Sequence, residues 1–255
     1  MNTGNPTDTA RRRFMGGVAT AAGMAVAPGV FLSQIARASS DSDSDSGREG
    51  VSSEVRWGML IDTNKCGSGC NACVRGCNEE HGLTVSDRPE IDAQWIRKVN
   101  LRDKKTGYTQ SLPMLCQHCE FPPCVDVCPT GASFRRADGI VLVDKHTCIG
   151  CRYCMMACPY KARSFIHEPL QDQLPHAPRG KGTVESCTFC VHRVDRDDNP
   201  IPACAEACTA EGHDAMVFGD LNDPNSRISR RLKRHGGRQV RADFRLNTGV
   251  WYQGI

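Results

Sequence analysis

A run of closely spaced cysteines near the middle of the chain constrains the fold more than any other feature. Cys148, Cys151, Cys154 and Cys158 follow the pattern C-x2-C-x2-C-x3-C, and Pro159 comes next. This spacing is typical of loops that bind iron–sulfur cubes, in which three thiolates hold one cube and the fourth cysteine is aimed at a second cube. The run therefore predicts another cysteine group elsewhere in the chain.

Three further groups of four cysteines meet that expectation. One of them repeats the pattern with a wider middle gap and again ends in Cys-Pro, at Cys128 and Pro129. The four quartets use all sixteen cysteines of the 255 residues. In chain order they are Cys66, Cys70, Cys73 and Cys77; Cys116, Cys119, Cys124 and Cys128; Cys148, Cys151, Cys154 and Cys158; and Cys187, Cys190, Cys204 and Cys208.

Three explanations compete for these thiols: four [4Fe-4S] clusters, structural zinc, or eight disulfides. Zinc sites pair two distant C-x2-C knuckles, whereas most of these quartets fall within about a dozen residues and two precede proline. The spacing favours four [4Fe-4S] clusters as cofactors. A structural zinc site remains an alternative mainly at the last quartet, where thirteen residues separate Cys190 from Cys204.

The rule that the fourth cysteine crosses to the neighbouring cube predicts which thiols share a cluster. It pairs the two central quartets with each other, and we expect the two outer quartets to pair likewise. Site I then comprises Cys66, Cys70, Cys73 and Cys208; site II, Cys77, Cys187, Cys190 and Cys204; site III, Cys116, Cys119, Cys124 and Cys158; and site IV, Cys128, Cys148, Cys151 and Cys154. The outer pairing would join the two ends of the folded chain.

The N-terminus has the pattern of an export signal. Arg11, Arg12 and Arg13 precede a weakly apolar region, and Ala36-Arg37-Ala38 is an A-x-A cleavage motif. We predict a twin-arginine signal over residues 1–38, a periplasmic location at the cytoplasmic membrane, and a disordered Ser/Asp linker over residues 39–50. The alternative is that the signal is not cleaved and serves as a membrane anchor. Because this route exports folded proteins, clusters inserted beforehand would keep the thiols ligated in an oxidising compartment.

The net charge of +3 lies entirely in the signal, where four arginines oppose Asp8. The remaining residues sum to zero, so we expect no nucleic-acid partner. After residue 38 no apolar run is long enough to span a membrane.

The folded part is predicted to consist of short strands and short helices between long loops. Strands are expected over residues 55–62, 95–101, 108–115 and 140–144, with a short helix that follows Cys77 and ends at Gly82. The second and third quartets each end in Cys-Pro-x-x-Ala and lead into a short strand. This repeat predicts an α+β fold of two ferredoxin-like halves, in which a 4Fe-4S dicluster unit is duplicated.

The predicted four-cluster domain covers residues 51–225, with quartets 66–77 and 187–208 as its outer pair and 116–128 and 148–158 as its inner pair. Residues 191–203 are expected to form a polar, hairpin-like loop. A basic C-terminal helix and tail follow over residues 226–255, with Asp223 as the expected helix cap and Gly236 near the helix end. The basic run over residues 227–245 is either a solvated face or a docking surface for an acidic partner or anionic lipid.

No nucleotide loop, paired catalytic carboxylates or haem-attachment motif occurs in the sequence. We therefore expect an electron-transfer subunit with no catalytic site of its own. His118 and His192, which lie close to cysteines, are expected to be structural or hydrogen-bonding residues and not ligands.

Residues 55–225 resemble the four-cluster iron–sulfur subunits of membrane-linked oxidoreductases, such as dimethyl sulfoxide, polysulfide and tetrathionate reductases. The similarity is close around Cys187-Thr188-Phe189-Cys190 and at Phe218-Gly219-Asp220. It implies two ferredoxin-like halves, crossed ligation and a line of four clusters for single-electron transfer.

The C-x3-C opening of the first quartet and the chain's own signal look most like the periplasmic iron–sulfur subunits of the Dsr membrane complex of dissimilatory sulfur metabolism. That resemblance implies a quinone-interacting integral membrane subunit, a multihaem c-type cytochrome and a cytoplasmic catalytic iron–sulfur subunit as partners. The alternative is the electron-transfer subunit of a molybdopterin reductase.

Overall fold

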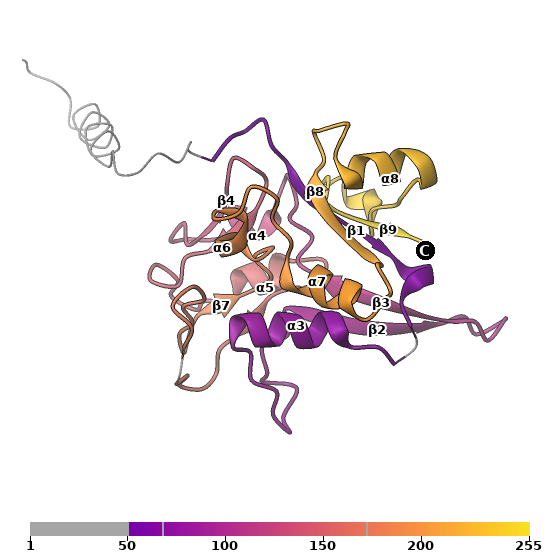
Figure 1. The fold of residues 1–255 in the computed structure, drawn as a ribbon. Helices are drawn as coiled ribbons and strands as arrows, with labels where there is room; N and C mark the ends of the chain where they lie inside the picture. The colour runs from indigo at the N-terminus through magenta and orange to yellow at the C-terminus, as the bar shows by residue number, and fades with distance from the viewer. Residues whose placement is uncertain (1–50, 68, 172) are drawn as a thin grey trace, which may run out of the picture. The chain divides into compact units, whose positions relative to one another are not determined.

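The computed structural model describes residues 51–255 apart from Ser68 and Asp172 (Figure 1). The predicted signal over residues 1–38 and the linker over residues 39–50 lie outside the described residues. Small sheets, few helices and long loops make up the described part, which is α+β as expected. None of its helices is long and apolar enough to cross a bilayer.

A three-stranded sheet joins segments from both ends of the described chain. Its strands are β1 (Trp57–Asp62), β8 (Met216–Asp220) and β9 (Val250–Gln253), in the order β8-β1-β9. β1 runs antiparallel to β8 and parallel to β9, with Met59 opposite both Phe218 and Val250. Met59, Leu60 and Ile61 are fully buried, so both faces of the central strand are covered. Strand β9, which was not anticipated from the sequence, ties the last residues of the chain into the core.

Helix α8 (Arg227–His235) covers one face of this sheet (Figure 1). Its Ile228 packs in a small cluster with Leu60 and Val217. The predicted cap was wrong, because Asp223 accepts from the N–H of Asn225 in a turn that precedes the helix. Ser226 is the actual N-cap and accepts from the N–H of Ser229 at 3.1 Å, while Gly236 ends the helix as predicted.

Helices α3 (Ala72–His81) and α7 (Ala203–Ala210) lie side by side (Figure 1). A Cβ at Gly76 would lie 2.7 Å from the Cβ of Ala207, so only glycine allows this approach. Gly82, with φ of 59°, ends α3 as predicted. The helix starts earlier than predicted, however, and therefore carries Cys73 and Cys77 on one buried side.

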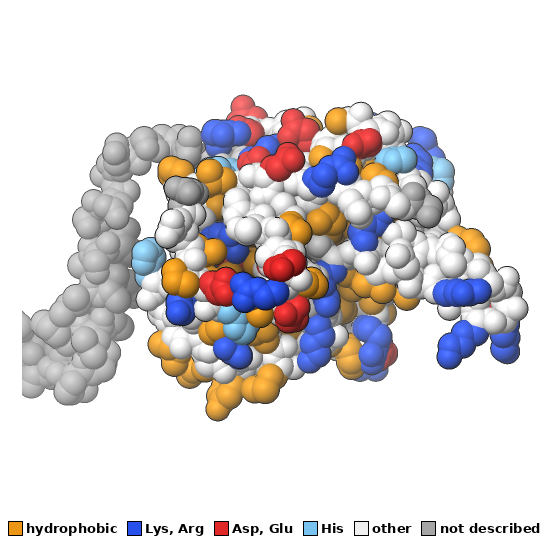
Figure 2. Space-filling model, turned by 90° about the horizontal axis from the view of Figure 1, so that it is seen from below, with side chains coloured by type: hydrophobic (Ala, Val, Ile, Leu, Met, Phe, Trp, Pro, Cys, Tyr) orange, Lys and Arg blue, Asp and Glu red, His pale blue; other side chains and the backbone are white. Residues whose placement is uncertain are grey.

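A long hairpin of β2 (Ile96–Arg102) and β3 (Thr109–Leu115) agrees with the prediction, including the turn between the strands. Ile96 pairs with Leu115 at the buried base, and residues 101–109 are exposed. Figure 2 shows Lys and Arg side chains gathered at the hairpin end of the molecule.

The short strands predicted after the two Cys-Pro motifs are present, and each pairs with a later strand. β4 (Ser133–Arg135) pairs with β5 (Val141–Val143), and β6 (Ser164–Phe165) with β7 (Val184–Glu185). The remaining elements are η1 (Thr63–Lys65), α4 (Pro123–Asp126), α5 (Tyr153–Ala157), α6 (Val191–Val194) and η2 (Ala242–Phe244).

The segment expected as a hairpin-like loop opens instead with the single turn α6. Cys190 has a left-handed backbone, with φ of 53°, and its carbonyl accepts from the N–H of Arg193 at 2.7 Å. The left-handed backbone of Cys190 therefore starts the helical turn. The polar composition of residues 191–203 does not reveal this conformation.

Candidate iron–sulfur sites

All sixteen cysteines lie in the described residues, and none of them forms a disulfide. Most are buried, and Cys151 is the exception whose residue is exposed. Two observations show which thiols lie close together: some line the same cavity, and some raise the pKa of their neighbours.

Site I is a shared cavity. Cys66, Cys70, Cys73 and Cys208 line it together with Lys98 and His213. Burial raises the pKa of Cys66 and of Cys73 to about 11, Lys98 lowers both pKa values, and Cys208 raises them. The N–H of Ala215 donates to Cys208 Sγ at 3.4 Å. The structure thus brings the first three thiols of the first quartet to the last thiol of the last quartet.

Site II is more deeply buried. Burial raises the pKa of Cys77, and Cys190 raises it further. Burial likewise raises the pKa of Cys204, with Cys190, Cys77 and Cys187 adding to the shift. The α3–α7 contact places these residues together, because Cys77 lies on α3 and Cys204 on α7.

Site III has three of its four thiols, Cys116, Cys119 and Cys158, within the main core. Burial raises the pKa of Cys119, with Cys116, Cys124 and Cys158 adding to the shift. Burial also raises the pKa of Cys124, and the nearby Arg163 lowers it.

Site IV lies nearest to the surface. Cys151 is exposed, Cys128 and Cys148 are half-buried, and Cys154 packs with Val141 and Val184 in a small separate cluster. The N–H of Ser133 donates to Cys128 Sγ, and that of Val184 to Cys148 Sγ, each at 3.4 Å. At Cys128 burial raises the pKa of the thiol, but hydrogen bonds from Ser133 and Thr130 lower it by more, so the pKa falls to about 7.

The four sites follow one another in space. Cys73 of site I adds to the raised pKa of Cys77 in site II, and Cys116 of site III to that of Cys187 in site II. Cys154 of site IV adds in the same way to the pKa of Cys124 in site III. Neighbouring thiols therefore connect the sites in the order I, II, III, IV, with sites I and IV at the two ends.

The donor set suits iron–sulfur cubes. Thiols gathered in fours and hydrogen-bonded by backbone N–H groups are the ligand environment that such clusters take. Burial keeps most of these thiols protonated and neutral when no metal is bound, whereas a metal centre binds cysteines as thiolates. That each predicted set of four ligates one cluster stays a prediction.

Comparison with known proteins gives the same chemistry. A sequence profile described as 4Fe-4S dicluster domain matches residues 108–221. The chain is similar to the Hdr-like menaquinol oxidoreductase iron-sulfur subunit 1 of Archaeoglobus fulgidus, with 42% identity over 80% of this chain and 85% of that protein. It shares 37% identity with a subunit of the tetrathionate reductase of Salmonella typhimurium, over 92% and 83% of the two chains. Protein NrfC of Escherichia coli is 38% identical over 70% of this chain and 72% of that protein.

The chain belongs to the family of 4Fe-4S dicluster iron–sulfur subunits. Its cofactors are [4Fe-4S] clusters, and its sixteen cysteines provide for four of them. The relatives from Archaeoglobus fulgidus and Salmonella typhimurium are subunits of a menaquinol oxidoreductase and of a tetrathionate reductase.

One buried charge of this family member was not anticipated from the sequence. Arg163 is 5% exposed, and its Nη2 donates to Cys124 Sγ at 3.1 Å. Its Nη1 donates to Ser133 Oγ at 2.7 Å. Arg163 and Ser133 both stand five residues after the cysteine of a Cys-Pro motif, so equivalent positions of the repeat bond to each other. Aligning the two repeats shows that the two positions are equivalent, but their hydrogen bond is visible only in the folded chain.

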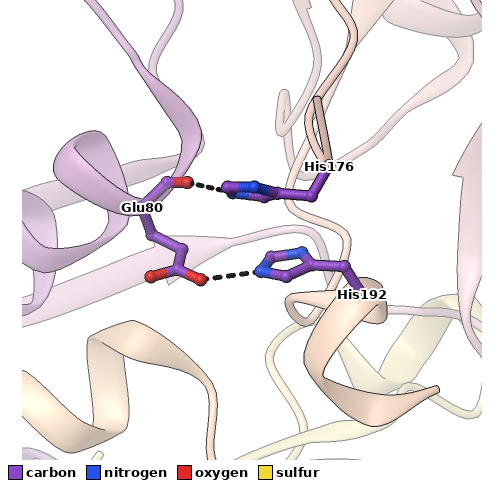
Figure 3. A group of neighbouring side chains, drawn as sticks. All are labelled: Glu80, His176 and His192. Carbon is purple, nitrogen blue, oxygen red and sulfur yellow. Dashed lines mark hydrogen bonds and ion pairs between the residues drawn. The ribbon is translucent and has the colours of Figure 1, made fainter. Parts of the chain in front are cut away.

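The two histidines that the sequence singled out make hydrogen bonds, as predicted. His118 is buried, and its Nδ1 accepts from the N–H of Val141 at 3.0 Å. His192 Nε2 lies 2.6 Å from Glu80 Oε1 (Figure 3).

A cluster of polar side chains surrounds Glu80 beside site II. His176 Nε2 lies 2.8 Å from the backbone oxygen of Glu80, and His192 approaches its carboxylate (Figure 3). These groups are close enough together to hold a metal ion. Arg193, however, donates to both carboxylate oxygens of Glu80 and also pairs with Glu206. Because a guanidinium already neutralises this carboxylate, we assign the cluster as a clamp between α3, α6 and α7.

Proposed function

We propose that the chain is a periplasmic subunit that relays single electrons through four [4Fe-4S] clusters in a quinone-interacting transmembrane complex of dissimilatory sulfur metabolism. The observation that carries the relay is the order of the four thiol sites. Cys73 of site I and Cys77 of site II lie on α3, Cys187 of site II and Cys116 of site III lie in the main core, and Cys124 of site III packs with Cys154 of site IV. When bound, each cluster would supply reversible one-electron chemistry. The protein's own residues hold the clusters in that order and bury the two middle sites.

Crossed ligation is part of this proposal, as are two ferredoxin-like halves. The shared cavity of site I supports it, since three of its thiols come from the first quartet and the fourth from the last. The paired hairpins after the two Cys-Pro motifs support the duplication.

Site IV is the end at which we place the membrane partner. Three large side chains around its cysteines are exposed: Ile149 at 68%, Met156 at 65% and Tyr153 at 54%. An apolar rim around an exposed thiol is suited to burial against another protein. The partners proposed are a quinone-interacting integral membrane subunit and a multihaem c-type cytochrome.

The similarity to a menaquinol oxidoreductase subunit supports the quinone-linked interpretation. The twin-arginine pattern supports the periplasmic location. A second candidate is the electron-transfer subunit of a molybdopterin reductase, which the similarity to the tetrathionate reductase subunit favours over most of the chain.

Purification of the native complex distinguishes the two candidates. The chain would be isolated anaerobically from membranes through an affinity tag at Gly107, in the exposed hairpin turn, and assayed for c-type haem and molybdenum. Haem without molybdenum is the result expected of the first proposal, whereas molybdenum without haem would favour the second. If neither accompanies the chain, the partner assignment fails.

A pair of variants tests the docking end. Met156→Glu places a charge in the apolar rim of site IV and should release the partners while the chain keeps its iron. Leu101→Glu is the matched control, because Leu101 is also exposed but lies on the β2–β3 hairpin. Equal retention of partners by both variants would contradict docking at site IV.

A further inference from the structure

The basic C-terminal run has no role in the proposal above. Residues 227–245 contain eight arginines and lysines and a single acidic residue, Asp243. The chain after residue 38 is balanced in charge as a whole, so this run concentrates positive charge in one region. Most of it lies on α8 and on the loop that follows.

Helix α8 is two-sided. Ile228 is fully buried against the sheet, whereas Arg230, Lys233 and Arg234 are exposed on the opposite side at spacings of three and four residues. None of these three pairs with an acidic group among the described residues. The other arginines of the helix are compensated, since Arg227 pairs with Asp214 and Arg231 with Asp62 and Asp214. The outer face therefore carries three uncompensated cations.

A hollow of about 590 Å³ continues this face beyond the C-terminal end of α8. Lys65, His235 and Arg238 line it, and its acidic lining residue, Asp62, is already paired with Arg231. Lys65 immediately precedes Cys66 of site I, so the hollow lies beside one end of the line of sites. Cys66 is itself half-buried.

We propose that the outer face of α8 and this hollow form a docking surface for an acidic segment of a redox-partner protein, which exchanges electrons at site I. The inference rests on the proposed electron-transfer function and adds a second docking end, opposite to the apolar rim of site IV. Complementary charge steers such encounters and raises their rate by about 10- to 1,000-fold, more at low salt than at high salt.

A protein partner fits this surface better than a lipid bilayer does. Helices that lie on membranes insert large apolar side chains beside their basic ones. In α8 the apolar residue Ile228 is turned into the sheet, and the hollow adds a single exposed large apolar residue, Ile255. The hollow is concave, which accepts a projecting segment and not a flat surface.

The test compares two triple variants that carry the same change of charge. Arg230→Glu, Lys233→Glu and Arg234→Glu reverse the docking face, while Arg102→Glu, Lys104→Glu and Lys105→Glu reverse exposed cations of the hairpin. The probe is a fluorescent twelve-residue polyglutamate peptide, added at low salt to the cluster-loaded chain. The α8 variant should bind it at least about tenfold more weakly, and the hairpin variant less than about twofold more weakly. Equal weakening in both variants would overturn the proposal.

Two further measurements complete the test. In flotation with phosphatidylglycerol vesicles, the two variants should behave alike. If only the α8 variant loses flotation while its peptide binding is unchanged, the surface binds lipid and not a protein, and the proposal is overturned. Reduction of the clusters by dithionite should be the same in both variants. A chain whose clusters accept no electrons would refute the electron-transfer function itself, whatever the peptide binding shows.

Discussion

Removal of the buried charge of Arg163 should lower the reduction potential of the cluster at site III. The Nη2 atom lies 3.1 Å from Cys124 Sγ, and Arg163 is almost completely buried. An electron added to the cluster is attracted by this guanidinium, so reduction becomes harder when the charge is removed. Cys124, Cys116 and Cys154 lie close enough to Arg163 to raise its pKa against the effect of burial, which means that it stays protonated.

The size of the effect follows from Coulomb's law. Two unit charges 3.1 Å apart interact by about 5 kcal/mol at an effective dielectric constant of about 20, which corresponds to about 0.2 V for one electron. The added electron is shared over the cluster, so the mean distance is longer; at twice the distance the shift is about 0.1 V. We therefore expect the midpoint potential of site III to fall by about 0.1–0.2 V in Arg163→Gln.

Redox titration followed by electron paramagnetic resonance measures this potential, and iron content shows whether the cluster is retained. Arg163→Lys keeps the positive charge and should shift the potential by less than half as much. The reasoning is refuted if Arg163→Gln retains its iron and shifts site III by less than about 0.03 V, or if the Lys variant shifts it equally.

Three further predictions concern ligation, the clamp and a turn. Cys158→Ser should damage the cluster of site III more than that of site IV in resonance spectra, and selective loss at site IV would contradict crossed ligation. Hydrogen bonds from Arg193 hold the pKa of Glu80 at about 2, so the clamp stabilises the fold fully above pH 4.5 and this stabilisation is lost as the pH falls towards 2. At pH 7 Glu80→Gln should lower the free energy of unfolding by about 1–2 kcal/mol, so the variant should release its clusters about 5–30 times faster than the unaltered chain in guanidinium. This difference in rate should shrink at pH 3. An equal difference at both pH values would count against the clamp. A Cβ at Gly150 (φ 70°) would lie 2.0 Å from the backbone oxygen of Gly182, so Gly150→Ala should lose about a quarter of the iron. Gly131→Ala is the control, because Gly131 has a similar φ of 71° but open space around it, and this variant should keep its iron. Similar iron contents in the two variants would show that the contact is not needed.

Local signals in the sequence predicted many elements correctly. Gly82 marks the end of α3 because only a residue tolerant of left-handed φ continues the chain there. The turn between β2 and β3 and the strands after the two Cys-Pro motifs also follow from local patterns. The crossing rule placed Cys66, Cys70, Cys73 and Cys208 at one site, and these four residues line one cavity; their ligation of a common cluster stays a prediction.

Features that depend on distant contacts were not predictable in this way. Strand β9 contains β-favouring residues between Gly249 and Gly254, but it is only four residues long, and its pairing with β1 is visible only in the folded chain. Asp223 and Ser226 are both good caps, and packing of Ile228 on the sheet decides for Ser226. Arg163 resembles any surface arginine in sequence, although it is buried beside Cys124.

The most direct test of the central claim is a coulometric titration of the purified, cluster-loaded chain, combined with assays of iron and acid-labile sulfide. Four clusters that each take up one electron predict about four electrons, sixteen irons and sixteen sulfides per chain. Bound zinc in place of iron at any site, or uptake of only about two electrons by a chain with full iron content, would contradict a four-cluster relay.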